Sequence, residues 1–116
     1  MAYFGNNACK AWLNLNMSSG NINDDFNVSG VTDHDSGDFT VSWDTDFANS
    51  NYAVAALSSN HEADNGDSYN ALSGRNVSGD RAVGTFRFRC IRLRFDTGNV
   101  PQFKDSTNAC LVAFGD

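Results

Sequence analysis

The stretch Phe86-Arg-Phe-Arg-Cys-Ile-Arg-Leu-Arg-Phe95 alternates apolar and basic side chains almost without interruption. A period of two is typical of a β-strand with one face on a core and the other in water. The alternation slips by one residue between Cys90 and Ile91, and such a slip would turn the apolar face away from the core. We therefore predict a long antiparallel strand here, with a β-bulge near Cys90 and Ile91.

Apolar runs of strand length recur before this stretch. In Cys9–Asn16 the small and aliphatic residues share one face, which leaves Trp12 on the more polar face. Phe26–Thr32 is interrupted by Gly30, which indicates a bulge. The polar turn after Thr32 then predicts a hairpin to Phe39–Trp43, whose apolar residues alternate cleanly and place Trp43 in the core.

Two further runs are apolar throughout. Tyr52–Leu57 has the length of a strand buried on both faces, although a helix also fits this run. Ala109–Phe114 predicts the strand that closes the sheet. Between them Ser58–Asp80 is rich in Asn, Ser, Gly and Asp, so it is either a long exposed loop or a weak edge strand.

The composition favours strands and turns over helices. Thirteen Asp stand against a single Glu, together with fifteen Asn, twelve Ser and ten Gly. The short polar side chains bond to nearby backbone, and glycine tolerates positive φ, so both are typical of turns. Short apolar runs between such clusters predict an all-β fold, a single antiparallel sandwich or barrel-like domain over residues 1–116.

The charge and the apolar content limit the partners. A net charge of −6 gives the protein no overall positive field, so we expect no nucleic-acid partner. No apolar run approaches the roughly 20 residues that cross a bilayer. Met1–Lys10 also lacks the basic and apolar segments of a signal peptide, so we expect no membrane partner and a product of the cytoplasm.

No motif predicts a reactive centre, a metal site or a cofactor. Asp33–Asp38 imitates the opening of a calcium loop, but its Gly stands fifth where an EF-hand has it sixth. His61-Glu62 is not followed by a second His four residues on, and no Ser lies in a Gly-x-Ser-x-Gly elbow. We therefore expect no catalytic residue, no metal, no cofactor and no enzymatic activity.

The three cysteines are an odd number at wide spacing. Disulfide frameworks and zinc sites need pairs of cysteines at closer spacing. We expect Cys9, Cys90 and Cys110 to be buried free thiols, each within a strand.

Arg87, Arg89, Arg92 and Arg94 gather four of the eight basic residues into eight positions. One interpretation is a solvated strand face with cross-strand Asp partners, each pair contributing under about 1 kcal/mol. The other is an interface, because the arginine fork suits carboxylates and is enriched at protein contacts. Many aromatic residues in a small domain favour the second, and Trp12 is the expected apolar anchor beside the arginines.

Five motifs distributed along nearly the whole chain resemble a family. They are Lys10-Ala-Trp12, Asp25-Phe-Asn-Val-Ser-Gly-Val-Thr-Asp33, Ser36-Gly-Asp-Phe-Thr-Val41, Asn51-Tyr-Ala-Val54 and Cys110-Leu-Val-Ala-Phe-Gly-Asp116. With them the chain resembles a domain of tailed-bacteriophage virion proteins, often found at the C-terminal end of tail-fibre-like proteins. The motifs are structural, and the resemblance brings no catalytic set.

The resemblance implies a virion structural protein. The chain begins at Met1 with almost nothing before the opening motif, so it departs from the family in having no shaft, and Ser58–Arg81 need not match any relative. Arg92 and Arg94 stand where such domains tend to carry a polar strand face. We therefore expect a homotrimeric capsid decoration or cement protein, which stabilises the head by binding the major capsid protein or other virion proteins. It would be assembled in the host cytoplasm and located in the virion.

Two alternatives remain at this point. The first is a tail-fibre or spike tip that binds a host surface polysaccharide or protein, with Tyr69 and His61 as receptor contacts and Trp12 as a further stacking platform. The second is a lectin-like accessory module of an enzyme.

Overall fold

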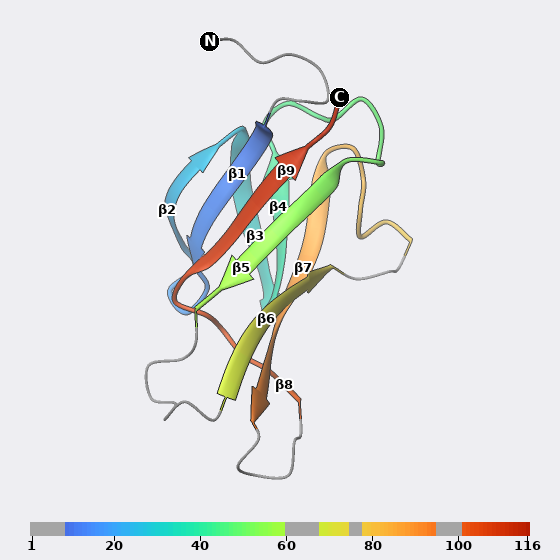
Figure 1. The fold of residues 1–116 in the computed structure, drawn as a ribbon. Helices are drawn as coiled ribbons and strands as arrows, with labels where there is room; N and C mark the ends of the chain where they lie inside the picture. The colour runs from blue at the N-terminus through green and yellow to red at the C-terminus, as the bar shows by residue number, and fades with distance from the viewer. Residues whose placement is uncertain (1–8, 60–67, 75–77, 95–100) are drawn as a thin grey trace.

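Nine β-strands form the parts of the chain that the computed structural model describes, residues 9–59, 68–74, 78–94 and 101–116 (Figure 1). The two antiparallel sheets that they build pack together as one compact domain, which confirms the expected all-β antiparallel fold. The strands are β1 Cys9–Asn16, β2 Asn21–Phe26, β3 Val28–Asp35, β4 Asp38–Trp43, β5 Ala53–Ser58, β6 Ser68–Gly74, β7 Thr85–Arg94, β8 Gln102–Phe103 and β9 Ala109–Phe114.

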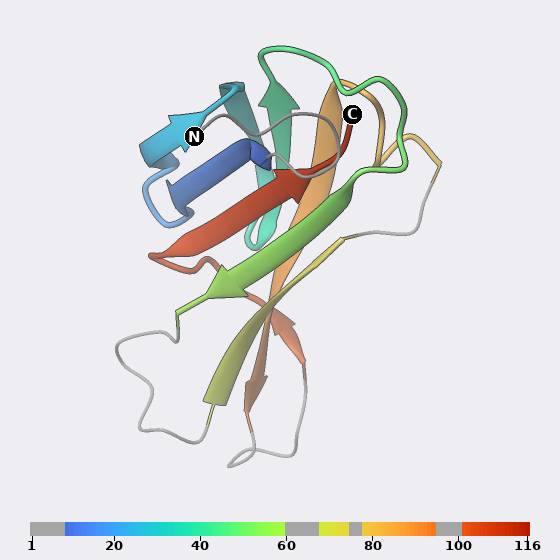
Figure 2. The ribbon, with the colours of Figure 1, turned by 45° about the horizontal axis from the view of Figure 1, so that its top comes forward.

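The first sheet, sheet A, has the order β2-β1-β9-β5, and the second, sheet B, has the order β3-β4-β7-β6 with β8 paired to β7. Figure 2 shows the two layers, with β1, β9 and β5 in front of β4 and β7. The described residues include no helix that could cross a membrane.

The inward faces of the two sheets share one hydrophobic core. β1 buries every second residue, as its sequence predicts, and Phe39 on β4 stacks near Phe88 on β7 with ring centroids 6.3 Å apart. Trp43 is only 4% exposed, which confirms its predicted core position. Its ring meets Phe47 and Tyr52 edge to face, with centroids 5.6 and 6.1 Å away, and these three rings close one end of the core.

The chain changes sheets at Asn27, between β2 and β3. Asn27 has φ 57°, its Oδ1 accepts a hydrogen bond from the Thr45 N–H at 2.6 Å, and its Nδ2 donates to the Thr45 carbonyl at 3.1 Å. The single strand predicted from Phe26 to Thr32 is therefore wrong, because Phe26 ends β2 and β3 begins at Val28. The bulge predicted at Gly30 is confirmed by a shift in the β3–β4 register between Val28 and Gly30.

The bulge predicted near Cys90 and Ile91 is wrong. β7 pairs with β6 without a shift from Ser68↔Arg94 to Gly74↔Phe88. The slip in the sequence instead marks a change in what the strand packs against. Up to Cys90 the inward face lies in the core, whereas Ile91 lies on the opposite face, where it pairs with Phe103 of β8. Figure 1 shows this end of β7, with β6 and β8, extending beyond sheet A.

The prediction that Tyr52–Leu57 is buried on both faces is wrong for most of the run. Tyr52 is 2% exposed, but β5 is an edge strand whose residues Ala53, Ala55, Ala56 and Leu57 are exposed. Leu57 is 74% exposed. An apolar run without charges therefore occupies an edge of sheet A, where it leaves apolar surface in water.

Gly37 in the β3–β4 turn lies in close contact with the backbone of β7 and of the segment after β8. Its φ is 65°, its carbonyl accepts a hydrogen bond from the Cys90 N–H at 2.8 Å, and its N–H donates to Asp105 Oδ1 at 2.7 Å. A Cβ at this position would lie 2.5 Å from the Cys90 carbonyl oxygen and 2.7 Å from the Lys104 nitrogen, and both atoms belong to the backbone.

We predict that Gly37→Ala lowers the free energy of unfolding by at least about 2 kcal/mol, because a left-handed residue with a side chain costs about 1–2 kcal/mol before any clash is counted. The control is Gly20→Ala, since Gly20 also has positive φ (76°) but no atom within 4 Å of the added Cβ. Urea unfolding of both variants measures the difference. Equal losses for the two would contradict the close approach at Gly37.

Candidate subunit-contact surface

An apolar row crosses all four strands of sheet A on its outer face. Trp12 on β1 pairs with Phe26 on β2 and with Val112 on β9, and Val112 pairs with Ala55 on β5. Residues paired across neighbouring strands share a face, and Trp12 alternates with buried residues of β1, so all four point away from the core. We call Phe26, Trp12, Val112 and Ala55 the apolar row.

Large apolar side chains flank the apolar row on the same face. Leu57 pairs with Cys110, and Phe114 pairs with Ala53. Phe26, Leu57 and Phe114 are 51%, 74% and 38% exposed. Single exposed apolar residues are ordinary, but a contiguous group on one sheet face is typical of an interaction surface.

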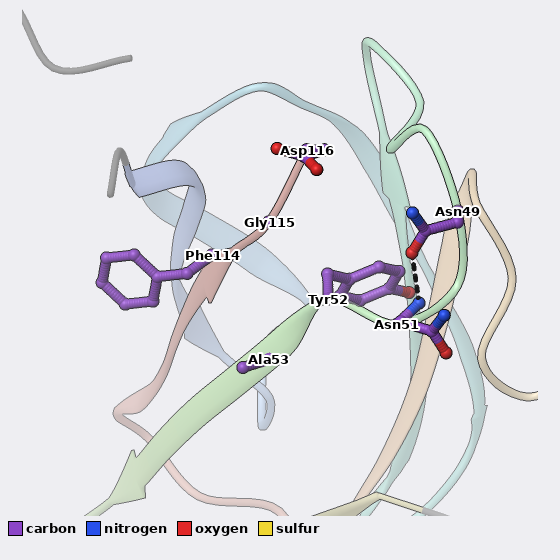
Figure 3. A pocket seen from close by; sticks show the side chains of 7 residues that line it. All are labelled: Asn49, Asn51, Tyr52, Ala53, Phe114, Gly115 and Asp116. Carbon is purple, nitrogen blue, oxygen red and sulfur yellow. Dashed lines mark hydrogen bonds between the residues drawn. The ribbon is translucent and has the colours of Figure 1, made fainter. Parts of the chain in front are cut away.

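A hollow of about 340 Å³ adjoins this face at the C-terminal end of β9 (Figure 3). It is lined by Asn49, Asn51, Tyr52, Ala53, Phe114, Gly115 and Asp116. The hydroxyl oxygen of Tyr52 lies 2.8 and 2.9 Å from the carbonyl oxygens of Ala82 and Thr85, so the ring is held in the core and is not a free stacking platform. The lining therefore extends the contact face and offers no paired acid and base.

Arg87 and Arg89 lie on the outer face of sheet B, on the other side of the sandwich from Trp12. Arg87 pairs across strands with Thr40 and Arg89 with Asp38, two residues of β4 that alternate with the core residues Phe39 and Val41. The expectation that Trp12 is an anchor beside the arginines is therefore wrong. The core separates them.

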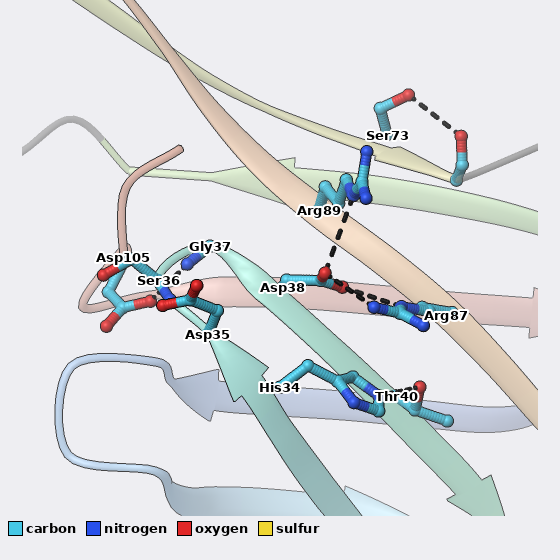
Figure 4. A network of polar contacts seen from close by, with 11 residues as sticks. His34, Asp35, Ser36, Gly37, Asp38, Thr40, Ser73, Arg87, Arg89 and Asp105 are labelled. Atoms are coloured by element: carbon cyan, nitrogen blue, oxygen red, sulfur yellow. Dashed lines mark hydrogen bonds and ion pairs between the residues drawn. The ribbon is translucent and has the colours of Figure 1, made fainter. Parts of the chain in front are cut away.

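Asp38 organises the arginine side of sheet B (Figure 4). Arg87 donates to it through both prongs of its fork, from Nε to Oδ1 at 2.9 Å and from Nη2 to Oδ2 at 2.8 Å. Arg89 Nε lies 3.7 Å from Asp38 Oδ2, and its guanidinium lies 4.9 Å from the centre of the Phe103 ring. The hydrogen bond from Arg87 is the main cause that holds the pKa of Asp38 below its usual value. Both arginines thus have partners within the chain, as the cross-strand interpretation requires.

Arg92 and Arg94, the other two of the four clustered arginines, differ from this pair. Arg92 is 8% exposed and donates from Nη2 to Gln102 Oε1 at 3.1 Å, so it is an internal residue and not the surface residue expected. The backbone of Arg94 pairs with Ser68, and its side chain lies outside the described residues. Within the described part of the chain, the four arginines therefore do not form one continuous row on the surface.

The two residues expected at a receptor contact are placed only in part. The backbone of Tyr69 belongs to β6 and pairs with Leu93, whereas its side chain lies outside the described residues. His61 also lies outside them.

The three cysteines are free and each lies in a strand, as predicted. Cys90 is buried as predicted, and burial raises the pKa of its thiol to about 11. Cys110 is only partly buried. Cys9 is exposed, which contradicts the prediction for that thiol.

Among the described residues no three His, Cys, Asp or Glu side chains are grouped as metal ligands. Comparison of the chain with protein-family models, with curated proteins and with solved structures finds no match.

The exposed apolar residues of β2, β5 and β9 are the part of this surface that sequence reasoning missed. One signal was present. Ala53–Leu57 contains three alanines and no bulky residue at its centre, whereas strands buried on both faces are rich in Val, Ile and Leu.

We predict that Asp38→Asn destabilises the fold at neutral pH by more than the ~0.5 kcal/mol typical of a surface change. The pKa of Asp38 is lower in the folded chain than its usual 3.8, so its ion pairs stabilise the fold above that pH and lose their contribution as the pH falls through the lowered pKa. Urea unfolding of the wild type and the variant should therefore differ at pH 7 and converge in acid. A difference that is independent of pH would contradict the pairing.

We also predict that Arg92→Gln lowers the free energy of unfolding by about 1–3 kcal/mol, because it alters a buried and hydrogen-bonded cation. Arg89→Gln is the matched control, since the side chain of Arg89 is 32% exposed and its contact with Asp38 is long. Thermal unfolding of both variants measures the contrast. A larger loss for Arg89→Gln would show that Arg92 is not internal.

Proposed function

We propose that this protein is a non-enzymatic structural component of a tailed-phage virion, a trimeric decoration or cement protein that binds the major capsid protein. The observation that carries the proposal is the exposed apolar face of sheet A, with the apolar row at its centre and Leu57 and Phe114 beside it. The motifs described in the sequence analysis supply the virion context.

The energetics favour an assembly over an isolated domain. Each fully buried large apolar side chain contributes about 1.5–3 kcal/mol relative to leaving it in water. Phe26, Leu57 and Phe114 keep much of that surface exposed, so contact with another chain is where the gain is available. Several such contacts per trimer would act together, which raises the effective concentration at each site and resists pressure from packaged DNA.

The arginine face takes a secondary part in this proposal. Arg87 and Arg89 are held by Asp38 and are partly exposed, with side-chain exposures of 26% and 32%. Because these guanidinium groups are already held in place, they can bind carboxylates of a virion partner with little further loss of side-chain entropy. The alternative, a tip that binds a host receptor, would use Tyr69 and His61, and the side chains of both lie outside the described residues.

Phe26→Ser tests the proposal, with Phe103→Ser as the matched control. Phe26 is 51% and Phe103 50% exposed, but only Phe26 lies in the apolar row. We expect Phe26→Ser to weaken association with expanded, DNA-free capsids about fivefold or more, since half of a Phe side chain is worth about 1 kcal/mol in each subunit contact. Phe103→Ser should weaken binding far less, because Phe103 contacts Arg89 of the arginine face, which has only a secondary part.

Binding is measured by co-sedimentation with capsids, and copy number by gel densitometry of purified particles. A decoration protein is present in hundreds of copies, on the order of the number of capsomer junctions, and makes its contact at each of them. Equal binding by the two variants, or a protein present in only a few copies per particle, would contradict the proposal.

A further inference from the structure

β5 is an edge strand, and part of its backbone has no hydrogen-bond partner among the described residues. It stands last in the order β2-β1-β9-β5, so among the described residues no strand pairs with its other side. Ser59 N–H donates to the Asn108 carbonyl at 3.0 Å, in the same register as the β5–β9 pairs. Backbone groups in an antiparallel pair alternate in direction, so those of Val54, Ala56 and Ser58 face away from β9.

The other edges differ from β5 in charge or in cover. β2 carries Asp24 and Asp25, and β3 carries a charged end at Asp33–Asp35. β6 contacts the end of β5, where Asn70 Nδ2 donates to the Ser59 carbonyl at 2.8 Å, so this contact covers β6 and the Ser59 end of β5 and does not involve the Val54–Ala56 part of β5. Charged side chains and cover are the devices that keep strand edges from pairing with other chains. Ala53–Ser58 has no charge and no proline.

We propose that β5 pairs antiparallel with β5 of a second copy about a twofold axis, which joins the two four-stranded sheets into one of eight strands. The free groups at Val54 and Ala56 restrict the register, because they must form the hydrogen-bonded pairs across the new contact. Two registers then give the same overlap of Ala53–Ser58, one centred on Ala55 and one on Ala56. Because β6 contacts the Ser59 end of β5, we take the one centred on Ala55, which places Val54 opposite the partner's Ala56 and Ala55 opposite the partner's Ala55.

This register continues the apolar row across the contact. Ala55 is the last residue of the row in one copy, so the partner's Ala55 begins the same row in the next copy. The small side chains allow the close approach of a pair without backbone hydrogen bonds, where Cα atoms lie about 4.5 Å apart. The apolar faces of the two copies therefore become one surface.

The uncharged sequence of β5 makes this edge the place where a second copy can approach. The chain carries a net charge of −6, so two copies repel each other at most orientations, whereas β5 against β5 opposes no charged pair. A cleft of about 180 Å³ between β5 and β6 is lined by Val54, Ala56, Leu72, Ser73, Gly74, Arg81, Phe86, Phe88 and Leu111. Inward side chains of an added strand would lie over its mouth, because sheet faces continue across a strand pair.

The pairing goes beyond the proposed function. It involves one edge of sheet A, whereas capsid binding is proposed for the outer face, so it would join copies or trimers in pairs without occupying Phe26. It requires no virion component, and the purified chain is enough to test it.

Substitutions at Ala55 test the pairing, because it is exposed and meets itself across the axis. We expect the weight-average mass of the wild type, measured by sedimentation velocity, to rise as its concentration rises. Ala55→Lys and Ala55→Glu should each lower the association constant more than tenfold, because like charges then stand directly opposite. An equimolar mixture of the two variants should restore association, because opposite charges meet.

Ala71→Lys is the matched control, an exposed alanine on edge strand β6 of the other sheet, and it should associate like the wild type. Melting temperatures confirm that each variant is folded. A wild-type mass that does not rise with concentration would overturn the pairing. So would undiminished association of Ala55→Lys, a mixture that does not recover, or a loss caused by Ala71→Lys. Capsid binding is measured in a separate experiment. A result that contradicts capsid binding therefore does not contradict the β5 pairing, and a result that contradicts the pairing does not contradict capsid binding.

Discussion

Burial of the inward faces of β1, β9, β4 and β7 in one core is the constraint on which the rest of the structure depends. Phe39 and Phe88 are the largest fully buried side chains of sheet B, and Leu13 and Leu111 join them in the core from sheet A, each no more than 1% exposed. Because side chains alternate along a strand, fixing these residues inward also fixes Trp12 and Val112 outward, and Arg87 outward on the opposite sheet. The apolar face and the arginine face are thus two consequences of one packing arrangement.

The outer faces of the two sheets differ in polarity. The outer face of sheet B carries the ion pairs of Arg87 and Arg89 with Asp38. Sheet A shows a continuous apolar row and an uncharged edge at β5. Polar groups on one side and apolar surface on the other are the arrangement expected of a domain that is stable alone and gains free energy by association. The proposed virion role and the proposed β5 pairing both use this asymmetry, through different parts of sheet A.

Much of the fold was predictable because strand periodicity is local. The alternation in Cys9–Asn16 and Phe39–Trp43 predicted the buried residues correctly, and Gly30 predicted its bulge. The errors arose where burial depends on distant chain segments. The slip in the apolar alternation after Cys90 indicated a bulge, but it marks the point where β7 extends beyond the core and pairs with β8. The run Ala53–Leu57 looked doubly buried, but no strand covers its outer edge among the described residues.

The sequence by itself determined that the protein is an antiparallel β-domain and which side chains alternate between the faces of most of its strands, because these properties follow from composition and a period of two. Only the tertiary structure decided which strands are edges, which face meets solvent, and that Trp12 lies on the opposite face from Arg87 and Arg89 while Arg92 is internal. Those properties depend on strand order and on contacts between residues far apart in the chain, and a local pattern carries no information about either.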